Sequence, residues 1–249
     1  MRLDLCTWPE VEAYLGERTD IIVPIGSTEQ HGPNGLIGTD ALCAEAIGRA
    51  AGERAGALVA PTISIGMAQH HLGFPGSVSL RPSTLVALVR DVIASLARHG
   101  FTRIGFVNGH GGNVATVGAA FAEYYAETSF SAAPGNAAPA ECRLRNWWEL
   151  PAAVRLREEL YGRAEGSHAT PSEVAITQAV FPDHIKRADM RPEIAPGGSF
   201  ADAADYRRRF PDGRIGSNPA LATPEAGARL LETAAAELAE EHLQWIRRV

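Results

Sequence analysis

The spacing of apolar residues switches repeatedly between two patterns along the chain, which predicts short strands separated by longer helices. Short runs of apolar and β-branched residues are typical of buried strands. Three such strands are expected at residues 20–25, 57–66 and 103–113, the last running into a Gly-rich turn. A fourth segment, residues 141–150, alternates and ends in Trp147-Trp148, and a short strand is expected at 77–80.

Helical spacing fills most of the intervals between these runs. It is clearest in residues 82–98, where large apolar residues recur every three or four positions. Thr39 is expected to cap a helix that Gly56 closes, and Pro171 to begin another with Glu173 in its first turn. Further helices are expected at residues 9–16, 114–127 and 151–161, and over 218–249 with its cap near Thr223.

The order of these elements predicts the fold class. Strands that alternate with helices of crossover length favour parallel pairing. We therefore expect an α/β fold with a mostly parallel sheet and helices on both faces. At 249 residues the chain is expected to form one domain, residues 1–249. Residues 131–140 are expected to be a flexible surface connection, and the irregular residues 182–217 a lid or an oligomer contact.

Composition and charge exclude several classes of function. The net charge of −6 and the scattered arginines argue against a nucleic-acid partner. No apolar run is long enough to cross a membrane and no signal peptide is evident, so a cytoplasmic protein is expected. Three widely spaced cysteines indicate neither a disulfide framework nor a thiolate zinc site, and Cys43 is expected to be a core residue.

Polar side chains gather in loops where predicted strands end. Glu29, His31 and Asp40 follow the first strand, and His110 follows the third. Loops at the carboxyl ends of parallel strands converge on one crevice. Two carboxylates and two imidazoles suit zinc, manganese or iron better than calcium, and a carboxylate such as Asp40 can bridge two ions. Two ions activate water and polarise a carbonyl, as amide hydrolysis requires.

Other interpretations of these loops stay open. The GHGGN turn, residues 109–113, could hold a phosphate at a helix N-terminus, although it matches neither a Walker motif nor GxGxxG. No GxSxG elbow supports a serine hydrolase. His99 and His242 are expected to be surface or packing residues. Trp147 and Trp148 follow a strand end and are candidates for a pocket wall, although such residues often belong to the core.

Five motifs, in the same order along the chain, resemble the creatininase (creatinine amidohydrolase) family. PIGSTEQHGPNGLIGTD looks like that family's GSxEQHGPHLPLxTD signature, and HLGFPGSVSL resembles its HxxFPGTxSL block. VNGHGGN is similar to the family's turn of the same sequence. SHATPSE stands where the family has HAGxxE, and GSNPALATPEAG resembles the block before its terminal helix.

The resemblance implies a three-layer α/β/α sandwich and a homo-oligomer, often a hexamer. It also implies two divalent metal ions per chain and hydrolysis of a small cyclic or linear amide. Its motifs mark five metal ligands, two substrate-pocket residues and two catalytic residues. The ligands would be Glu29, His31, Asp40 (bridging), His110 and Glu173. The pocket would include Asn34, and His71 at its rim. Trp147 and Trp148 are added to the expected pocket because of their position after a strand end. Glu173 and His168 would be catalytic.

Departures from the family pattern bear on the second metal and on the substrate. Gly111 and Gly112 stand where creatininase has a Tyr-Glu pair, so Glu173 is the candidate replacement ligand. Asn34 stands where the family has histidine. Relatives with the glycine turn include a formylamino-pyrimidine deformylase and the mycofactocin-precursor peptidase, so formamide or short-peptide hydrolysis is an alternative. A non-catalytic nucleotide- or phosphosugar-binding module and a one-metal structural protein are further alternatives.

Overall fold

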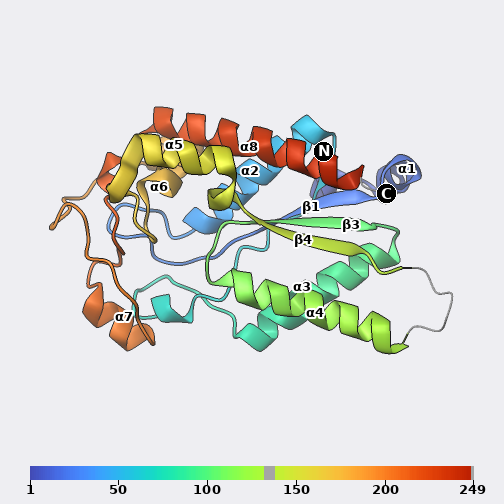
Figure 1. The fold of residues 1–249 in the computed structure, drawn as a ribbon, viewed down its shortest axis with the longest axis horizontal. Coiled ribbons are helices and arrows are strands. Elements are labelled where there is room, and N and C mark those ends of the chain that lie inside the picture. The colour runs from blue at the N-terminus through green and yellow to red at the C-terminus, as the bar shows by residue number, and fades with distance from the viewer. Residues whose placement is uncertain (132–137, 248–249) are drawn as a thin grey trace.

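A four-stranded parallel sheet lies between two layers of helices (Figure 1) in the computed structural model, which describes residues 1–131 and 138–247. The strands run in the order β2-β1-β3-β4, and all neighbours are parallel. Their bounds are β1 Asp20–Ile25, β2 Leu58–Val59, β3 Arg103–Asn108 and β4 Glu141–Asn146. The predicted α/β class is confirmed.

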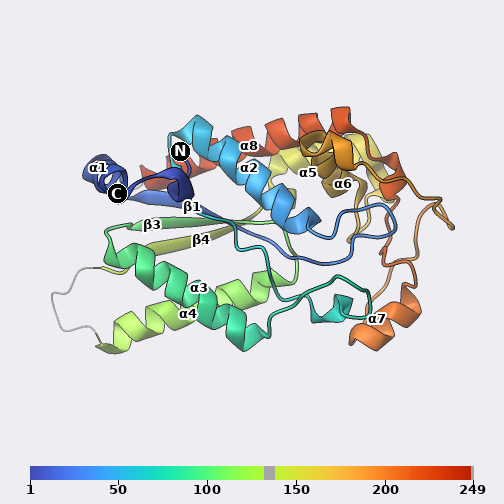
Figure 2. The ribbon, with the colours of Figure 1, turned by 180° about the vertical axis from the view of Figure 1, so that it is seen from behind.

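The helices of the described residues divide between the two faces of the sheet (Figures 1 and 2). One face carries α2 (Thr39–Ala55), α5 (Pro151–Tyr161), α6 (Pro171–Val180) and α8 (Pro224–Ile246). The other carries α3 (Pro82–Arg98) and α4 (Asn113–Ser131). Two further helices, α1 (Trp8–Glu17) and α7 (Ala203–Arg209), lie at opposite ends of the molecule.

Alternation along the strands explains the two layers. Successive strand side chains point to opposite faces, so Ile22 and Val107 enter the core beneath α2 and α8. Ile21, Val23 and Phe106 enter the core beneath α3 and α4. The strands read as continuous apolar runs because both faces are covered.

Register brings the loops after β1, β3 and β4 to one edge of the sheet. Ile25 pairs with Asn108, and Asn108 pairs with Asn146, so three strands end at the same level. Helix α2 returns to this edge at its N-terminus, where the Cβ of any side chain at Gly109 would lie 2.1 Å from Asp40 O. Glycine at this position therefore allows the β3 loop to contact the first turn of α2.

Several predicted boundaries are wrong. The strand expected at 57–66 is paired in order only at Leu58–Val59. Ala60 N donates to Ile22 O and Ile63 N to Pro24 O, so one extra residue interrupts the ladder. The strand expected at 77–80 is a single bridge between Thr28 and Val78. Thr39 is not the cap of α2 but its first residue, and its hydroxyl donates to Leu36 O.

Other expectations are confirmed. Gly56 closes α2 in the left-handed conformation, with φ 64°. Thr170 caps α6, with Pro171 first and Glu173 in the first turn, and Thr223 caps α8. Cys43 is fully buried. The expected connection at 131–140 falls largely outside the described residues, since residues 132–137 are not described.

Residues 182–217 contain structure that the sequence did not indicate. Helix α7 carries Tyr206, which is fully buried with Phe74, Phe210 and Ile215 in a small separate core. The helices of the described residues include none that is both long and apolar enough to cross a membrane.

Candidate metal centre

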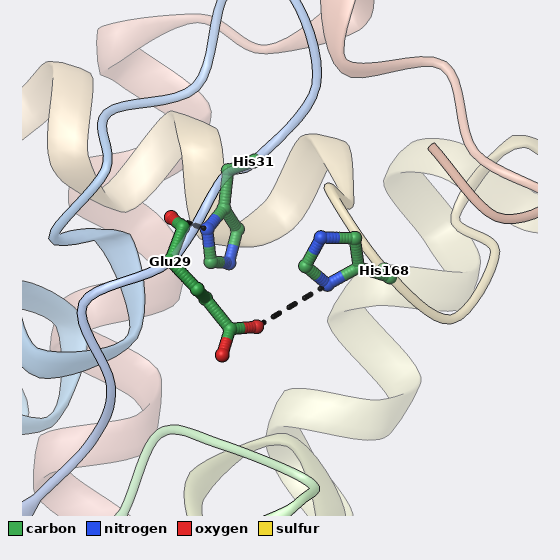
Figure 3. Close-up of side chains that lie close together, drawn as sticks. All are labelled: Glu29, His31 and His168. Carbon is green, nitrogen blue, oxygen red and sulfur yellow. Dashed lines mark hydrogen bonds and ion pairs between the residues drawn. The ribbon is translucent and has the colours of Figure 1, made fainter. Parts of the chain in front are cut away.

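The predicted polar residues meet at the carboxyl edge of the sheet. Glu29 and His31 lie in the loop after β1, His110 follows β3, and Asp40 and Glu173 lie in the first turns of α2 and α6. His168 comes from the loop before α6 and faces Glu29 and His31 (Figure 3). Five separate segments thus contribute titratable side chains to one place.

These residues form three overlapping groups that could each hold a metal ion. In each group one ligand atom per residue lies within 4.8 Å of the others. The groups are Glu29/His31/His168, Glu29/Asp40/His110 and His31/Asp40/Glu173. Since Glu29, His31 and Asp40 each belong to two groups, the arrangement can hold neighbouring ions with shared ligands.

Backbone carbonyls fix the tautomers of two imidazoles. His31 Nδ1 lies 3.1 Å from Glu29 O, and His168 Nε2 lies 2.9 Å from Gln30 O. A carbonyl only accepts, so each of these ring nitrogens must carry a proton. His31 Nε2 and His168 Nδ1 are left facing the carboxylates (Figure 3), which is how histidines at metal sites are usually oriented.

His110 is held in the same way. Its Nε2 donates to Met67 O at 3.0 Å, and its Nδ1 lies 2.9 Å from Asp40 Oδ2. A Cβ on Gly112 would lie 2.4 Å from His110 Nε2 and 2.5 Å from Met67 O. Gly112 is therefore required because a side chain there would collide with His110. The glycine is explained without a phosphate-binding role for the turn.

Buried carboxylate oxygens at this site lack hydrogen bonds. Both oxygens of Glu29 and Oδ2 of Asp40 are buried and accept none from the described residues. Imidazole nitrogens lie 2.9–3.3 Å from them, but without the angles of hydrogen bonds. Such orphaned anions are costly unless a cation neutralises them. The donor set of carboxylate oxygens and imidazole nitrogens fits zinc, manganese or iron.

The charges of the site perturb its pKa values strongly. Burial alone would lower the pKa of His31, but Asp40, Glu173 and Glu29 raise it to about 10. Burial also opposes the charged form of His110, yet Glu29 and Asp40 raise its pKa to about 9. The pKa of Glu173 is raised chiefly by its burial. The field that holds protons on these imidazoles equally favours a divalent cation.

Gln30 supports this cluster, although it was not among the predicted site residues. Its Oε1 accepts from Gly32 N, and its Nε2 donates to Gly213 O at 2.9 Å and to His71 Nδ1 at 3.0 Å. The amide nitrogen also lies 2.9 Å from His168 Nε2, but its two protons already have acceptors. The position of Gln30 between Glu29 and His31 was the signal available in the sequence.

His71 lies behind Glu29 and is 1% exposed, so it is not at the pocket rim where it was expected. Its Nε2 is 3.0 Å from Glu29 Oε1. Burial, with His70 and the other imidazoles, lowers the pKa of His71 to about 2. A neutral His71 contacts the Glu29 carboxylate without neutralising its negative charge. Tyr206, which packs edge-on against His71, comes from α7 and was not foreseen.

A cavity of about 270 Å³ opens beside the cluster. Trp147 and Trp148 line it together with His110, His168 and Glu173, so the predicted pocket wall lies next to the candidate ligands. A larger apolar groove, of about 940 Å³, lies along α3 and the 60–65 segment, apart from the titratable cluster.

Asn34 lies elsewhere. It lines a different cavity, of about 560 Å³, and donates to Pro219 O. Arg157 and Glu165 were not predicted, yet Arg157 lines the cavity beside the cluster and is paired with Glu165. No motif marked them, because their pairing joins α5 to the loop before α6.

Comparison with known proteins agrees with this architecture. A family model described as creatinine amidohydrolase matches residues 4–241. A mycofactocin precursor peptide peptidase of Mycolicibacterium smegmatis is 33% identical over 190 residues, covering 73% of this chain and 70% of that protein. A creatinine amidohydrolase of Pseudomonas putida is 39% identical over 110 residues, 42% of each chain.

Solved creatininases share the fold. A creatininase mutant superposes with a TM-score of 0.87 at 24% identity, covering 99% of this chain and 98% of the other. A creatininase with Mn and a mutant of Zn-Zn type give TM-scores of 0.84 and 0.85, each at 25% identity and with the same coverage. The chain therefore belongs to the creatininase family of hydrolases that act on C–N bonds.

Proposed function

We propose that this protein is a metal-dependent amidohydrolase that binds two divalent ions per chain. The observation that carries the proposal is the set of three overlapping ligand groups beside a cavity of about 270 Å³. Glu29, His31, Asp40, His110 and Glu173 would hold the ions, with zinc, manganese and iron as candidates. Residues 1–249 would act as one domain, assembled into a homo-oligomer.

The bound ions would supply Lewis acidity for a water and for the amide carbonyl. The chain's own residues would orient the substrate and move the protons. Trp147 and Trp148 would form the wall against which the amide packs. Glu173 and His168 both line the cavity, so each can hold a proton on its way from the water to the leaving nitrogen.

The substrate class has two candidates. One is a small cyclic or linear amide, including formamides. The other is a short peptide, which is favoured by the 33% identity over 190 residues with a peptidase. The small cavity suits either a small amide or the end of a peptide.

The test is hydrolysis by metal-free protein supplied in turn with Mn, Fe and Zn. Cyclic amides, formamides and short peptides would be screened, with Asp40→Asn as the inactive control. Turnover that depends on added metal and is lost in the variant is expected. Absence of turnover with every metal, or full activity in Asp40→Asn, would refute the proposal. A melting temperature raised by phosphate and unaffected by EDTA would instead support a phosphate-binding module.

A further inference from the structure

We infer that Arg157 binds a carboxylate of the substrate, so that the enzyme prefers amides of amino acids and peptides with a free carboxyl end. This inference rests on the proposed amidohydrolase function. Arg157 lines the same cavity as His110 and Glu173. Among the described residues that line this cavity, it is the only arginine or lysine.

Two of the three guanidinium nitrogens of Arg157 donate hydrogen bonds to described residues, and the third does not. Nε donates to Glu165 Oε1 at 2.8 Å, and Nη1 donates to Trp148 O at 2.7 Å. Nη2 donates to none of the described residues and is not among the buried atoms that lack a partner. A mostly buried arginine that lines a cavity and has an unused donor group is suited to an incoming anion.

The surrounding residues hold Arg157 in place. Its guanidinium carbon lies 5.8 Å from the centre of the Trp147 ring. The carboxylate oxygen of Glu165 that binds Nε also accepts from the hydroxyl of Ser172, which itself lines the cavity. The guanidinium is therefore oriented before substrate arrives, which reduces the entropy lost on binding.

The acidic residues of the cavity define where a substrate carboxylate can bind. Asp40 and Glu173 are the acidic residues that line the cavity, and both belong to the candidate ligand groups. A carboxylate near them would be repelled unless ions were bound, whereas Arg157 attracts it. The scissile amide would then lie toward the ligand groups and the carboxylate toward α5.

The substrate class that fits is an N-acyl amino acid or a short peptide bound by its carboxyl end. In the reaction, a water oxygen bonds to the amide carbon and the C–N bond breaks. The nitrogen takes a proton from the water, and the products are an acid and an amine. A neutral cyclic amide offers Arg157 no anion.

The experiment compares matched acids and amides. Wild-type protein would be assayed on N-formylglycine against N-formylglycinamide, and on glycyl-phenylalanine against glycyl-phenylalaninamide. For whichever pair is hydrolysed, kcat/KM is expected to be about 10- to 100-fold higher for the acid, as a charge-assisted hydrogen bond provides. Arg157→Gln is expected to bring this ratio close to 1, chiefly through KM.

Arg155→Gln is the matched control, since Arg155 is exposed on the same helix. It should keep the wild-type ratio. Because Arg157→Gln leaves Glu165 unpaired, the double variant Arg157→Gln/Glu165→Gln removes both charges and guards against misfolding. A wild-type ratio near 1, or a high ratio that survives in these Arg157 variants, overturns the inference while the amidohydrolase proposal stands.

If no compound is hydrolysed, the proposed function fails. Ligand binding then tests whether Arg157 recognises a carboxylate. N-acetylglycine is then expected to raise the melting temperature of wild-type protein more than N-acetylglycinamide does. The difference should disappear in Arg157→Gln and persist in Arg155→Gln. Equal shifts for the two compounds in wild-type protein would overturn the role of Arg157.

Discussion

Asp40 joins the candidate ligand groups at the residue scale. Its Oδ1 lies 2.9 Å from His31 Nε2, and its Oδ2 lies 2.9 Å from His110 Nδ1. Each carboxylate oxygen therefore faces a different imidazole. Those imidazoles lower the pKa of Asp40, although burial opposes the effect, so it is a carboxylate at every physiological pH.

Asp40→Asn and Glu173→Gln should differ in their effects on metal content. An amide cannot bridge two ions, so Asp40→Asn is expected to lose both. Its metal affinity should fall by more than the roughly 10- to 100-fold that is typical when a residue supporting a ligand is mutated. Glu173 belongs to one group, so Glu173→Gln is expected to lose one ion. Elemental analysis after dialysis measures this. Asp189→Asn, at an exposed acid, should match wild type, and equal losses in the first two variants would contradict the sharing of Asp40.

At the scale of elements, helix α6 combines a structural and a chemical role in one side chain. Glu173 Oε1 accepts from Thr170 N at 2.5 Å, and the Thr170 hydroxyl accepts from Glu173 N. This capping box fixes the start of α6. The same carboxylate forms a candidate ligand group with His31 and Asp40. The cap therefore orients the ligand.

Loss of this cap should affect both stability and metal binding. Thr170→Ala is expected to cost about 1 kcal/mol of unfolding free energy, or roughly 2–4 °C in melting temperature. Metal affinity should fall as well, because Glu173 loses its anchor. Thr223→Ala removes the cap of α8 at similar cost, but Thr223 belongs to no ligand group, so metal affinity should not change. Calorimetric titration with Mn²⁺ separates the two, and identical metal affinity in both variants would refute the coupling.

Helix α8 is attached to β1 by a buried hydrogen bond between His242 and Asp20. His242 donates to Asp20 Oδ2 at 2.8 Å, and Arg18 donates to both oxygens of Asp20. Burial would raise the pKa of Asp20, but these hydrogen bonds lower it to about 2. The unfolded chain binds this proton near pH 3.8, so the stabilisation is complete above pH 4 and is lost as the pH falls toward 2.

Asp20→Asn should therefore destabilise the protein near neutral pH by about 1.5–3 kcal/mol, the range for hydrogen bonds to charged groups. The difference from wild type is expected to shrink between pH 4 and 2, where wild type loses the same interaction. Urea unfolding across this range measures it. Glu240→Gln, at an exposed carboxylate of α8, is the control and should show little effect. If Asp20→Asn lowers the free energy of unfolding by the same amount at every pH, the stabilising role of the Asp20 carboxylate is contradicted.

At the scale of the whole molecule, bound metal should hold together segments that are far apart in the sequence. The candidate ligands span residues 29 to 173 and five separate segments. A ligand that binds the folded state at 100 times its Kd adds about 2.7 kcal/mol. Removal of metal with EDTA is therefore expected to lower the melting temperature by roughly 5–10 °C, and added Mn²⁺ should restore it. An unchanged melting temperature would contradict a metal site built from these residues.

The sequence predicted the order of helices and strands better than it predicted contacts between side chains. Apolar periodicity located β1, β3, α3 and α8, because burial on both faces of a sheet or on one face of a helix leaves a local pattern. The short β2 was misjudged, since an extra residue between Ala60 and Ile63 interrupts the pairing without interrupting the apolar run. Gln30 was overlooked because side-chain hydrogen bonds between distant segments leave no local pattern.

The same limit applies to the cavity. Trp147 and Trp148 could be assigned to it because they follow a strand whose end the topology places at the site. Asn34 was assigned by motif alone, and the fold turns it toward Pro219. Arg157 depends on how α5 packs beside the loop before α6, which no periodicity specifies.

Trp147, Trp148 and Arg157 line the cavity, and none of the three belongs to a candidate ligand group. The proposed substrate contacts of these three residues and the candidate ion ligands would therefore be encoded in different parts of the gene. A mutant library confined to codons 147–157 should yield enzymes with new substrate preferences and wild-type metal content.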